Sequence, residues 1–186
     1  MKGRSLLIGA SVAVALAALA IGSAMSAQDK YSLKVPNGLA FSEFRGYESW
    51  QAIAISHNGP LIALILGNPT MINAYKAGPP GNGKPFPDGA KIAKIHWIPK
   101  KNEIAPGEPL VPGTLHDVDF MAKDSKRFAN SGGWGYGAFE YDAASDTFRP
   151  GNTTDTPPQE HDAKCGFACH TIVKNRDYVF TDYGKR

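Results

Sequence analysis

The sequence predicts an α+β fold, in which short strands joined by loops form a sheet and short helices pack against it. Two observations favour this class over a bundle of helices. The 14 prolines, together with many of the glycines, lie between short apolar runs, and such punctuation is typical of strands and turns. Two of the runs, residues 91–98 and 134–141, alternate with the period of two that places successive side chains on opposite faces of a strand.

The first 27 residues are predicted to be a secretory signal peptide and not part of the fold. Lys2 and Arg4 form a basic start, an apolar run of small and aliphatic residues follows, and cleavage is expected after Ala24 or Ala27. The run is too short and wrongly flanked for a membrane span, and no later run approaches the length that a span needs. We therefore expect an exported, soluble protein, which would be periplasmic in a Gram-negative cell.

Residues 28–186 are expected to form one domain, because a segment of this length can bury a core of its own. The formal net charge of the whole chain is +3 at pH 7, and part of it comes from Lys2 and Arg4, which leave with the signal peptide. The remaining domain is close to neutral and has no basic patch with interleaved aromatic residues. This argues against nucleic acid as a partner, and no membrane association is expected after cleavage.

Local patterns predict a hairpin followed by a helix in the first half of this domain. Residues 49–56 and 61–66 are predicted to be strands, joined by a turn at the Asn58-Gly59 step. The second strand is apolar on both faces, which favours a central place in the sheet. A short helix is predicted over residues 70–76, directly after a proline that suits a first helical turn, and residues 77–87 are predicted to be a loop.

The next predicted strand, residues 91–98, carries a lysine on an apolar face. With a period of two, Lys94 shares its face with Ile92, His96 and Ile98. Three interpretations of such a lysine remain open. It lies at an edge and extends its ammonium group to water, it pairs with a carboxylate, or it is used chemically.

The second half of the domain is predicted to alternate loops with short elements. Residues 99–113 are predicted to be a proline-rich loop, and residues 119–130 a helix with apolar anchors. Residues 134–141 are predicted to be a strand. Its internal glycines indicate either the close approach of a large flat group or ordinary packing of the sheet against a helix. Residues 142–162 are polar, and residues 177–183 are predicted to be a final strand or extended segment.

The strongest chemical signal is the pair Cys165 and Cys169, the only cysteines of the chain, followed directly by His170. Two close thiols beside an imidazole are typical of c-type haem attachment, in which the thiols bind the porphyrin and the histidine binds the iron. The usual motif has two residues between the cysteines, and here there are three. Because helix positions three and four apart share a face, both thiols can still reach one porphyrin edge. Two alternatives remain open: a local disulfide, or a zinc site formed by Cys165, Cys169 and His170, with or without His161.

Other candidate ligands are interpreted as packing or surface residues. Met121 belongs to the apolar side of the predicted helix, so we expect it to pack in the core. The remaining histidines are interpreted as surface or core side chains: His57, His96, His116 and His161.

Three blocks of residues resemble the cytochrome P-460 family and its relative cytochrome c′-beta. The blocks are residues 86–89 running into Lys94, residues 123–130 followed by Trp134, and Cys165…Cys169-His170 with residues 178–181. The resemblance extends roughly from residue 47 to residue 183. The cysteine block departs from the family pattern by its one inserted residue.

The resemblance implies an antiparallel sheet with packed helices and a homodimer, with one covalent haem c per chain near the C-terminus. It implies that Cys165 and Cys169 bind the porphyrin and that His170 is the proximal iron ligand. Lys94 matches the lysine that in P-460 proteins forms a covalent bond to a meso carbon of the porphyrin. The cytochrome c′-beta branch lacks this lysine. Asp119 falls where the enzymes of this family carry a distal carboxylate, although here it is shorter than their glutamate.

The implied activity is the oxidation of hydroxylamine, to nitrous oxide or nitric oxide, at a five-coordinate haem. A small redox protein would accept the electrons. Two alternatives are a protein of the cytochrome c′-beta type, which binds nitric oxide or carbon monoxide without turnover, and a haem-free domain of the same fold with a disulfide or zinc at the cysteines.

Overall fold

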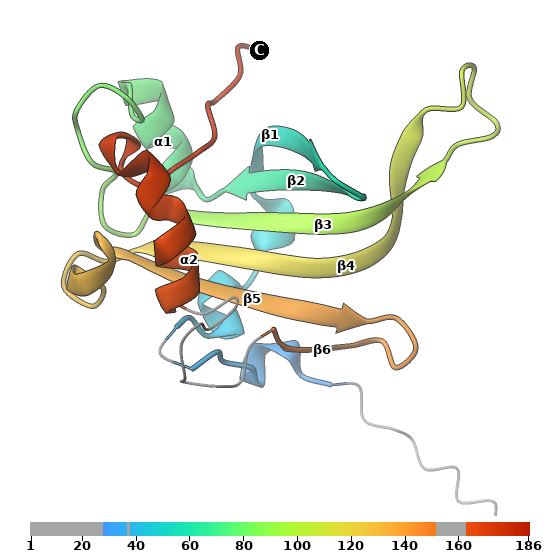
Figure 1. The fold of residues 1–186 in the computed structure, drawn as a ribbon, viewed down its shortest axis with the longest axis horizontal. Coiled ribbons are helices and arrows are strands. Elements are labelled where there is room, and N and C mark those ends of the chain that lie inside the picture. The colour runs from blue at the N-terminus through green and yellow to red at the C-terminus, as the bar shows by residue number, and fades with distance from the viewer. Residues whose placement is uncertain (1–27, 37, 152–162) are drawn as a thin grey trace, which may run out of the picture.

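The structure is a computed structural model that describes residues 28–36, 38–151 and 163–186 (Figure 1). The predicted signal peptide, residues 1–27, lies outside the described residues, as does His161. No helix of the described part has both the length and the apolar character needed to cross a membrane.

The architecture is one antiparallel sheet of six strands that follow each other in chain order, with short helices packed around it (Figure 1). This confirms the α+β class. The strands are β1 (Gln51–Asn58), β2 (Leu61–Gly67), β3 (Lys91–Lys101), β4 (Leu110–Lys123), β5 (Trp134–Asp142) and β6 (Thr147–Pro150). The helices are α1 (Pro69–Ala77), α2 (Ala163–His170) and the 3₁₀ turns η1 (Lys30–Ser32), η2 (Phe41–Phe44), η3 (Tyr47–Ser49), η4 (Ala129–Ser131) and η5 (Thr171–Arg176).

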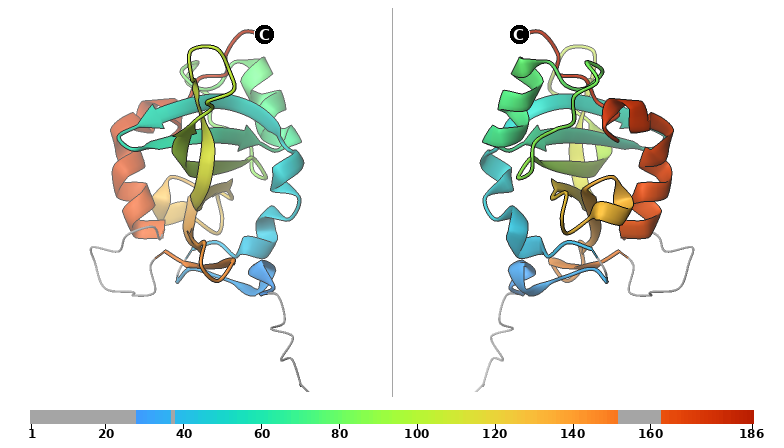
Figure 2. Two further views of the ribbon diagram at one scale, coloured as in Figure 1. Left: turned by 90° about the vertical axis from the view of Figure 1, so that its right-hand side faces the viewer. Right: turned by 90° about the vertical axis from the view of Figure 1, so that its left-hand side faces the viewer.

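Each face of the sheet is covered by a different part of the chain. The N-terminal segment packs on one face, where Phe41 and Phe44 are fully buried and the Phe44 ring stacks on Phe120 at a centroid distance of 4.0 Å. Helix α2 lies over the opposite face, so that the sheet is the middle layer (Figure 2). On this second face Ile92 and Met121 belong to a core shared with Val179 of the C-terminal segment.

Local signals account for the hairpin and for α1. The chain reverses at Gly59, whose φ of +55° requires the left-handed region that glycine adopts without strain. The Asn68 side chain accepts a hydrogen bond of 2.9 Å from the backbone N–H of Met71, and Pro69 occupies the first turn of α1. Both predicted elements are confirmed, with bounds shifted by one or two residues.

The helix predicted over residues 119–130 is wrong. Strand β4 runs through Lys123, and only the turn η4 at Ala129–Ser131 is helical. Residues 117–122 pair with β3 on one side and with β5 on the other. Hydrogen bonds to both neighbouring strands therefore pair the backbone N–H and C=O groups of this segment. These bonds outweigh its weak local preference for a helix.

The loop predicted over residues 99–113 is also wrong in part. β3 and β4 extend into an arm that projects from the sheet (Figure 1), and in this arm Pro99 pairs with Pro112. The register shifts between Ile98 and Pro99, and such irregular positions tolerate a residue that lacks an N–H donor. The short strand β6 was not predicted, and residues 179–183 form an extended segment outside the sheet.

Candidate functional site

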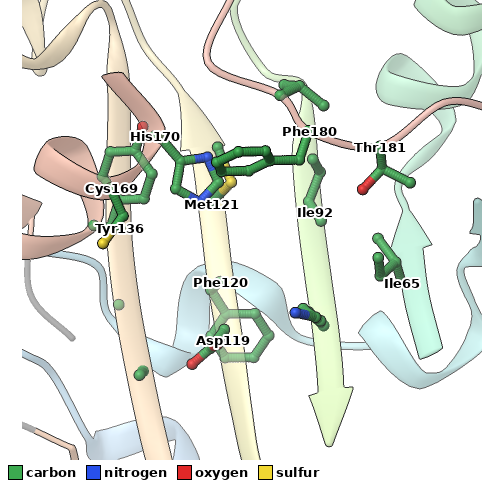
Figure 3. Close-up of a pocket in the computed structure, with 15 residues that line it drawn as sticks. Ile65, Ile92, Asp119, Phe120, Met121, Tyr136, Cys169, His170, Phe180 and Thr181 are labelled. Carbon is green, nitrogen blue, oxygen red and sulfur yellow. The ribbon is translucent and has the colours of Figure 1, made fainter. Parts of the chain in front are cut away.

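A cavity of about 340 Å³ lies between the sheet face under α2, the end of α2 itself and the C-terminal segment (Figure 3). Its size falls in the range of small-molecule and cofactor sites. Most of its lining is apolar. The lining residues are Ile65, Ile92, Lys94, Asp119, Phe120, Met121, Tyr136, Gly137, Ala138, Gly166, Cys169, His170, Val179, Phe180 and Thr181.

The floor of the cavity is set by strand register. Lys94 of β3 lies directly opposite Asp119 of β4, and Asp119 lies opposite Ala138 of β5. One pleat further along, Met121 and Tyr136 are opposite each other on the same face. Because side chains two residues apart in a strand share a face, both rows point toward α2.

Four of the five predicted site residues line this one cavity: Lys94, Asp119, Cys169 and His170. They come from β3, β4 and α2, so their assembly depends on long-range packing. The fifth, Cys165, belongs to α2 by its backbone, but its side chain lies outside the described part. Cys169 is exposed and takes part in no disulfide with any described residue.

His170 is held in the tautomer that a metal ligand needs. Its Nδ1 lies 2.6 Å from the backbone carbonyl oxygen of Tyr178, and since a carbonyl can only accept, Nδ1 carries the proton. Nε2 therefore has a lone pair to offer. Burial lowers the pKa of His170, and the positive charge of Lys94 lowers it further, although the Tyr178 bond acts in the opposite direction. These effects favour the neutral imidazole.

Gly166 lets α2 approach the sheet closely. A Cβ atom at Gly166 would lie 2.5 Å from Cγ of Tyr136, which is closer than side-chain carbons can pack. The Tyr136 ring in turn lies against the His170 ring, with centroids 5.1 Å apart. The glycine inside the cysteine motif thus sets the distance between His170 and the floor of the cavity.

We expect Gly166→Ala to destabilise the protein by about 1–3 kcal/mol, the usual cost of adding a methyl group where the packing has no room. The measurement is urea unfolding followed by circular dichroism. Gly184→Ala is the matched control, because a Cβ there meets no atom within 4 Å. Equal unfolding free energies for Gly166→Ala and the wild type would contradict this account.

A polar network that the sequence analysis missed begins beside Asp119. His96 Nδ1 lies 3.8 Å from Asp119 Oδ2 and is hydrogen-bonded to Asp117 Oδ1, while Asp117 Oδ2 bonds His116 Nδ1 at 2.6 Å. Burial alone would raise the pKa of Asp117, but the hydrogen bonds and charges of the two histidines hold it below its usual value. The available signal was the period of two, which places His96 two residues from Lys94 on one face.

Among the described residues, one group has the side chains and spacing to hold a metal ion: His96, Asp117 and Asp119, whose candidate ligand atoms lie within 4.8 Å of one another. Cys169 and His170 belong to no such group in that part of the chain. The alternative zinc site also includes Cys165, with His161 as an optional further ligand, and these side chains lie outside the described residues.

The cavity fits a haem group on two further grounds. Tyr136 is 4% exposed, and its hydroxyl has no hydrogen-bond partner among the described residues. A buried hydroxyl of this kind costs free energy unless a bound group satisfies it. His170 brings an imidazole lone pair to an otherwise apolar space, which suits an iron porphyrin with an axial nitrogen ligand.

Two comparisons with known proteins bear on this site. A search of curated proteins finds no match to the chain. The family model described as cytochrome P460 matches residues 44–181, a span that includes the whole sheet, α2 and all of the cavity-lining residues. The chain belongs to the cytochrome P460 family.

Proposed function

We propose that this haem protein of the cytochrome P460 type is a c-type mono-haem enzyme that oxidises hydroxylamine in the periplasm. The observation that carries the proposal is the cavity, in which Lys94, Asp119, Cys169 and His170 come together in a chain of this family. Each of them has a separate task in the proposed reaction. A small redox protein would accept the electrons.

Cys165 and Cys169 would bind the haem covalently through thioether bonds. They lie four residues apart within α2, so both belong to one side of the helix despite the extra residue in the motif. His170 follows at the end of the same helix and would bind the iron through Nε2, since its Nδ1 is engaged by Tyr178. The other side of the iron would then be left for a ligand.

Lys94 would hold the haem a second time, by a bond between Nζ and a meso carbon of the porphyrin. Forming this bond removes one hydrogen from the amine and one from the carbon, so it is an oxidation that requires an oxidant such as peroxide during maturation. The amine must be neutral to act as the nucleophile. The place of Lys94 in the lining of the same cavity as His170 supports this role.

The remaining residues would act on the substrate. The haem, when bound, supplies a site for the hydroxylamine nitrogen and the route by which its electrons leave. Asp119 would accept a proton from the substrate, because it is the carboxylate among the cavity-lining residues. The apolar side chains around it, such as Ile65 and Ile92, would exclude water, and nitrous oxide or nitric oxide would be the product.

The test is to express the protein in a bacterium competent for cytochrome c maturation, unfold it, digest it with protease and map the peptides by mass spectrometry. We expect one haem per chain, retained on unfolding and joining the Cys165–Cys169 peptide to the Lys94 peptide. In Lys94→Leu the haem should remain on the cysteine peptide alone, and the red-shifted Soret band of the reduced protein should be lost. Haem that dissociates from the unfolded wild type would refute c-type attachment, and an unchanged spectrum in Lys94→Leu would refute the second bond.

A further inference from the structure

A largely buried ion pair that the proposed reaction does not use joins the end of β4 to the segment that follows η5. Lys123, at the end of β4, and Asp177, after η5, have side chains that are 6% and 12% exposed. The Lys123 ammonium donates to both carboxylate oxygens of Asp177, at 2.7 and 2.9 Å, and to the carbonyl of Gly132, at 3.0 Å. All three protons of the ammonium are therefore engaged.

The ion pair holds a turn that its own sequence does not favour. Asp177 and Tyr178 have φ values of +50° and +63°, in the left-handed region that a bulky residue such as tyrosine rarely adopts. Two more bonds fix Asp177 in place. The backbone N–H of Phe86 donates to its Oδ2 at 2.7 Å, and Nε1 of Trp134 donates to its backbone carbonyl at 2.8 Å.

This turn presents the carbonyl that orients His170. The Tyr178 carbonyl oxygen accepts the Nδ1 proton of His170 at 2.6 Å, and the Tyr178 ring packs so closely on Gly132 that a Cβ there would lie 2.2 Å from it. A continuous set of contacts thus leads from Lys123 through Asp177 and Tyr178 to the imidazole. The carbonyl has little freedom to move unless Asp177 moves.

We propose that Lys123 and Asp177 are positioning residues for His170, which set the strength of its bond to the iron by fixing the Tyr178 carbonyl. This inference rests on the proposed function in one respect, that His170 is the axial ligand. A firm Nδ1–H···O=C hydrogen bond raises the basicity of a ligating imidazole and fixes the plane of its ring.

The character of the pair supports a positioning role over a purely stabilising one. Apolar residues that replace a buried ion pair often preserve or increase stability, so stability alone does not explain why two charges lie here. A bidentate ion pair does restrict geometry, and here it restricts the residue next to the carbonyl that His170 uses.

The test compares two variants in the haem-loaded protein: Asp177→Asn, and Lys123→Met combined with Asp177→Asn. Asparagine keeps an acceptor for the Phe86 N–H and adopts the left-handed region readily, so the backbone preference of the turn is retained. The double variant leaves no unpaired buried charge, which keeps the test available if the single variant does not accumulate. Asp182→Asn is the matched control, since Asp182 lies on the same segment but is 77% exposed and pairs with Arg176.

The readouts are the iron–histidine stretching band of the reduced protein, measured by resonance Raman spectroscopy, and the reduction potential. In both Asp177 variants we expect the band to shift to lower frequency and the potential to rise, at unchanged haem content, and Asp182→Asn to match the wild type. If the band and the potential were unchanged in folded Asp177 variants, the positioning role would be overturned and the proposed function would stand. A band that persists in His170→Gly would instead overturn the assignment of His170 as ligand, and with it the proposed function.

Discussion

Asp119→Asn is expected to slow hydroxylamine oxidation by about 10²–10⁴-fold while leaving haem content unchanged, because a positioned general base contributes a factor of that size. Asparagine has nearly the same shape as aspartate but cannot accept the proton. Asp119 lies opposite Lys94 in the β3–β4 register and lines the cavity, so its loss should affect the substrate and not the attachment of the haem. The measurement is the steady-state rate of hydroxylamine oxidation with an artificial electron acceptor.

Asp119→Glu is the matched variant for this prediction. It restores the longer side chain that the resemblance implies for the enzymes of the family, and it should retain or exceed the rate of the wild type. Equal rates in Asp119→Asn and the wild type would remove Asp119 from the mechanism. If the wild type bound nitric oxide, and neither it nor any variant oxidised hydroxylamine, the binding function of the cytochrome c′-beta type would be favoured.

The sequence predicted those parts of the site that depend on short-range patterns. Cys169 and His170 are adjacent in a single helix, and the period of two along β3 was enough to place Lys94 on a face with Ile92. Each of these inferences uses only neighbouring residues and the geometry of one element. The resemblance then added Asp119, which no local pattern singles out.

The errors came from segments whose structure is decided by distant residues. Asp119 and Met121 were placed on a helix, although two flanking strands make their segment β4. The same misassignment hid the fact that both side chains point into the cavity. His96 was interpreted as an ordinary histidine because its partner Asp117 lies across the hairpin, 21 residues further along the chain.

The support of His170 was equally out of reach of the sequence. Its partner is a backbone carbonyl, and that carbonyl belongs to Tyr178, which adopts a left-handed conformation that a bulky residue rarely shows. Such a turn is stable only because contacts with residues elsewhere in the chain hold it in this conformation. One of these contacts is the Lys123 ammonium, which donates to both carboxylate oxygens of Asp177.

Lys123→Met is expected to lower the free energy of unfolding by about 3–5 kcal/mol, a large part of the total stability of a typical domain. The substitution leaves the Asp177 carboxylate buried with one remaining side-chain hydrogen bond, from the backbone N–H of Phe86. The cost is then the desolvation of an unpaired charge. The measurement is equilibrium unfolding of the haem-loaded protein in urea.

The double variant Lys123→Met with Asp177→Asn separates the two contributions of this pair. It removes the unpaired charge, so most of the lost stability should return, whereas the weakened iron–histidine bond should not. Lys101→Met provides the control for loss of a lysine, because the Lys101–Glu108 pair is exposed and its removal should change stability by less than about 1 kcal/mol. If the single variant were as stable as the wild type, the ammonium would not be needed to hold the turn. Recovery of stability without recovery of the iron–histidine band would show that the charges are retained for the geometry of His170.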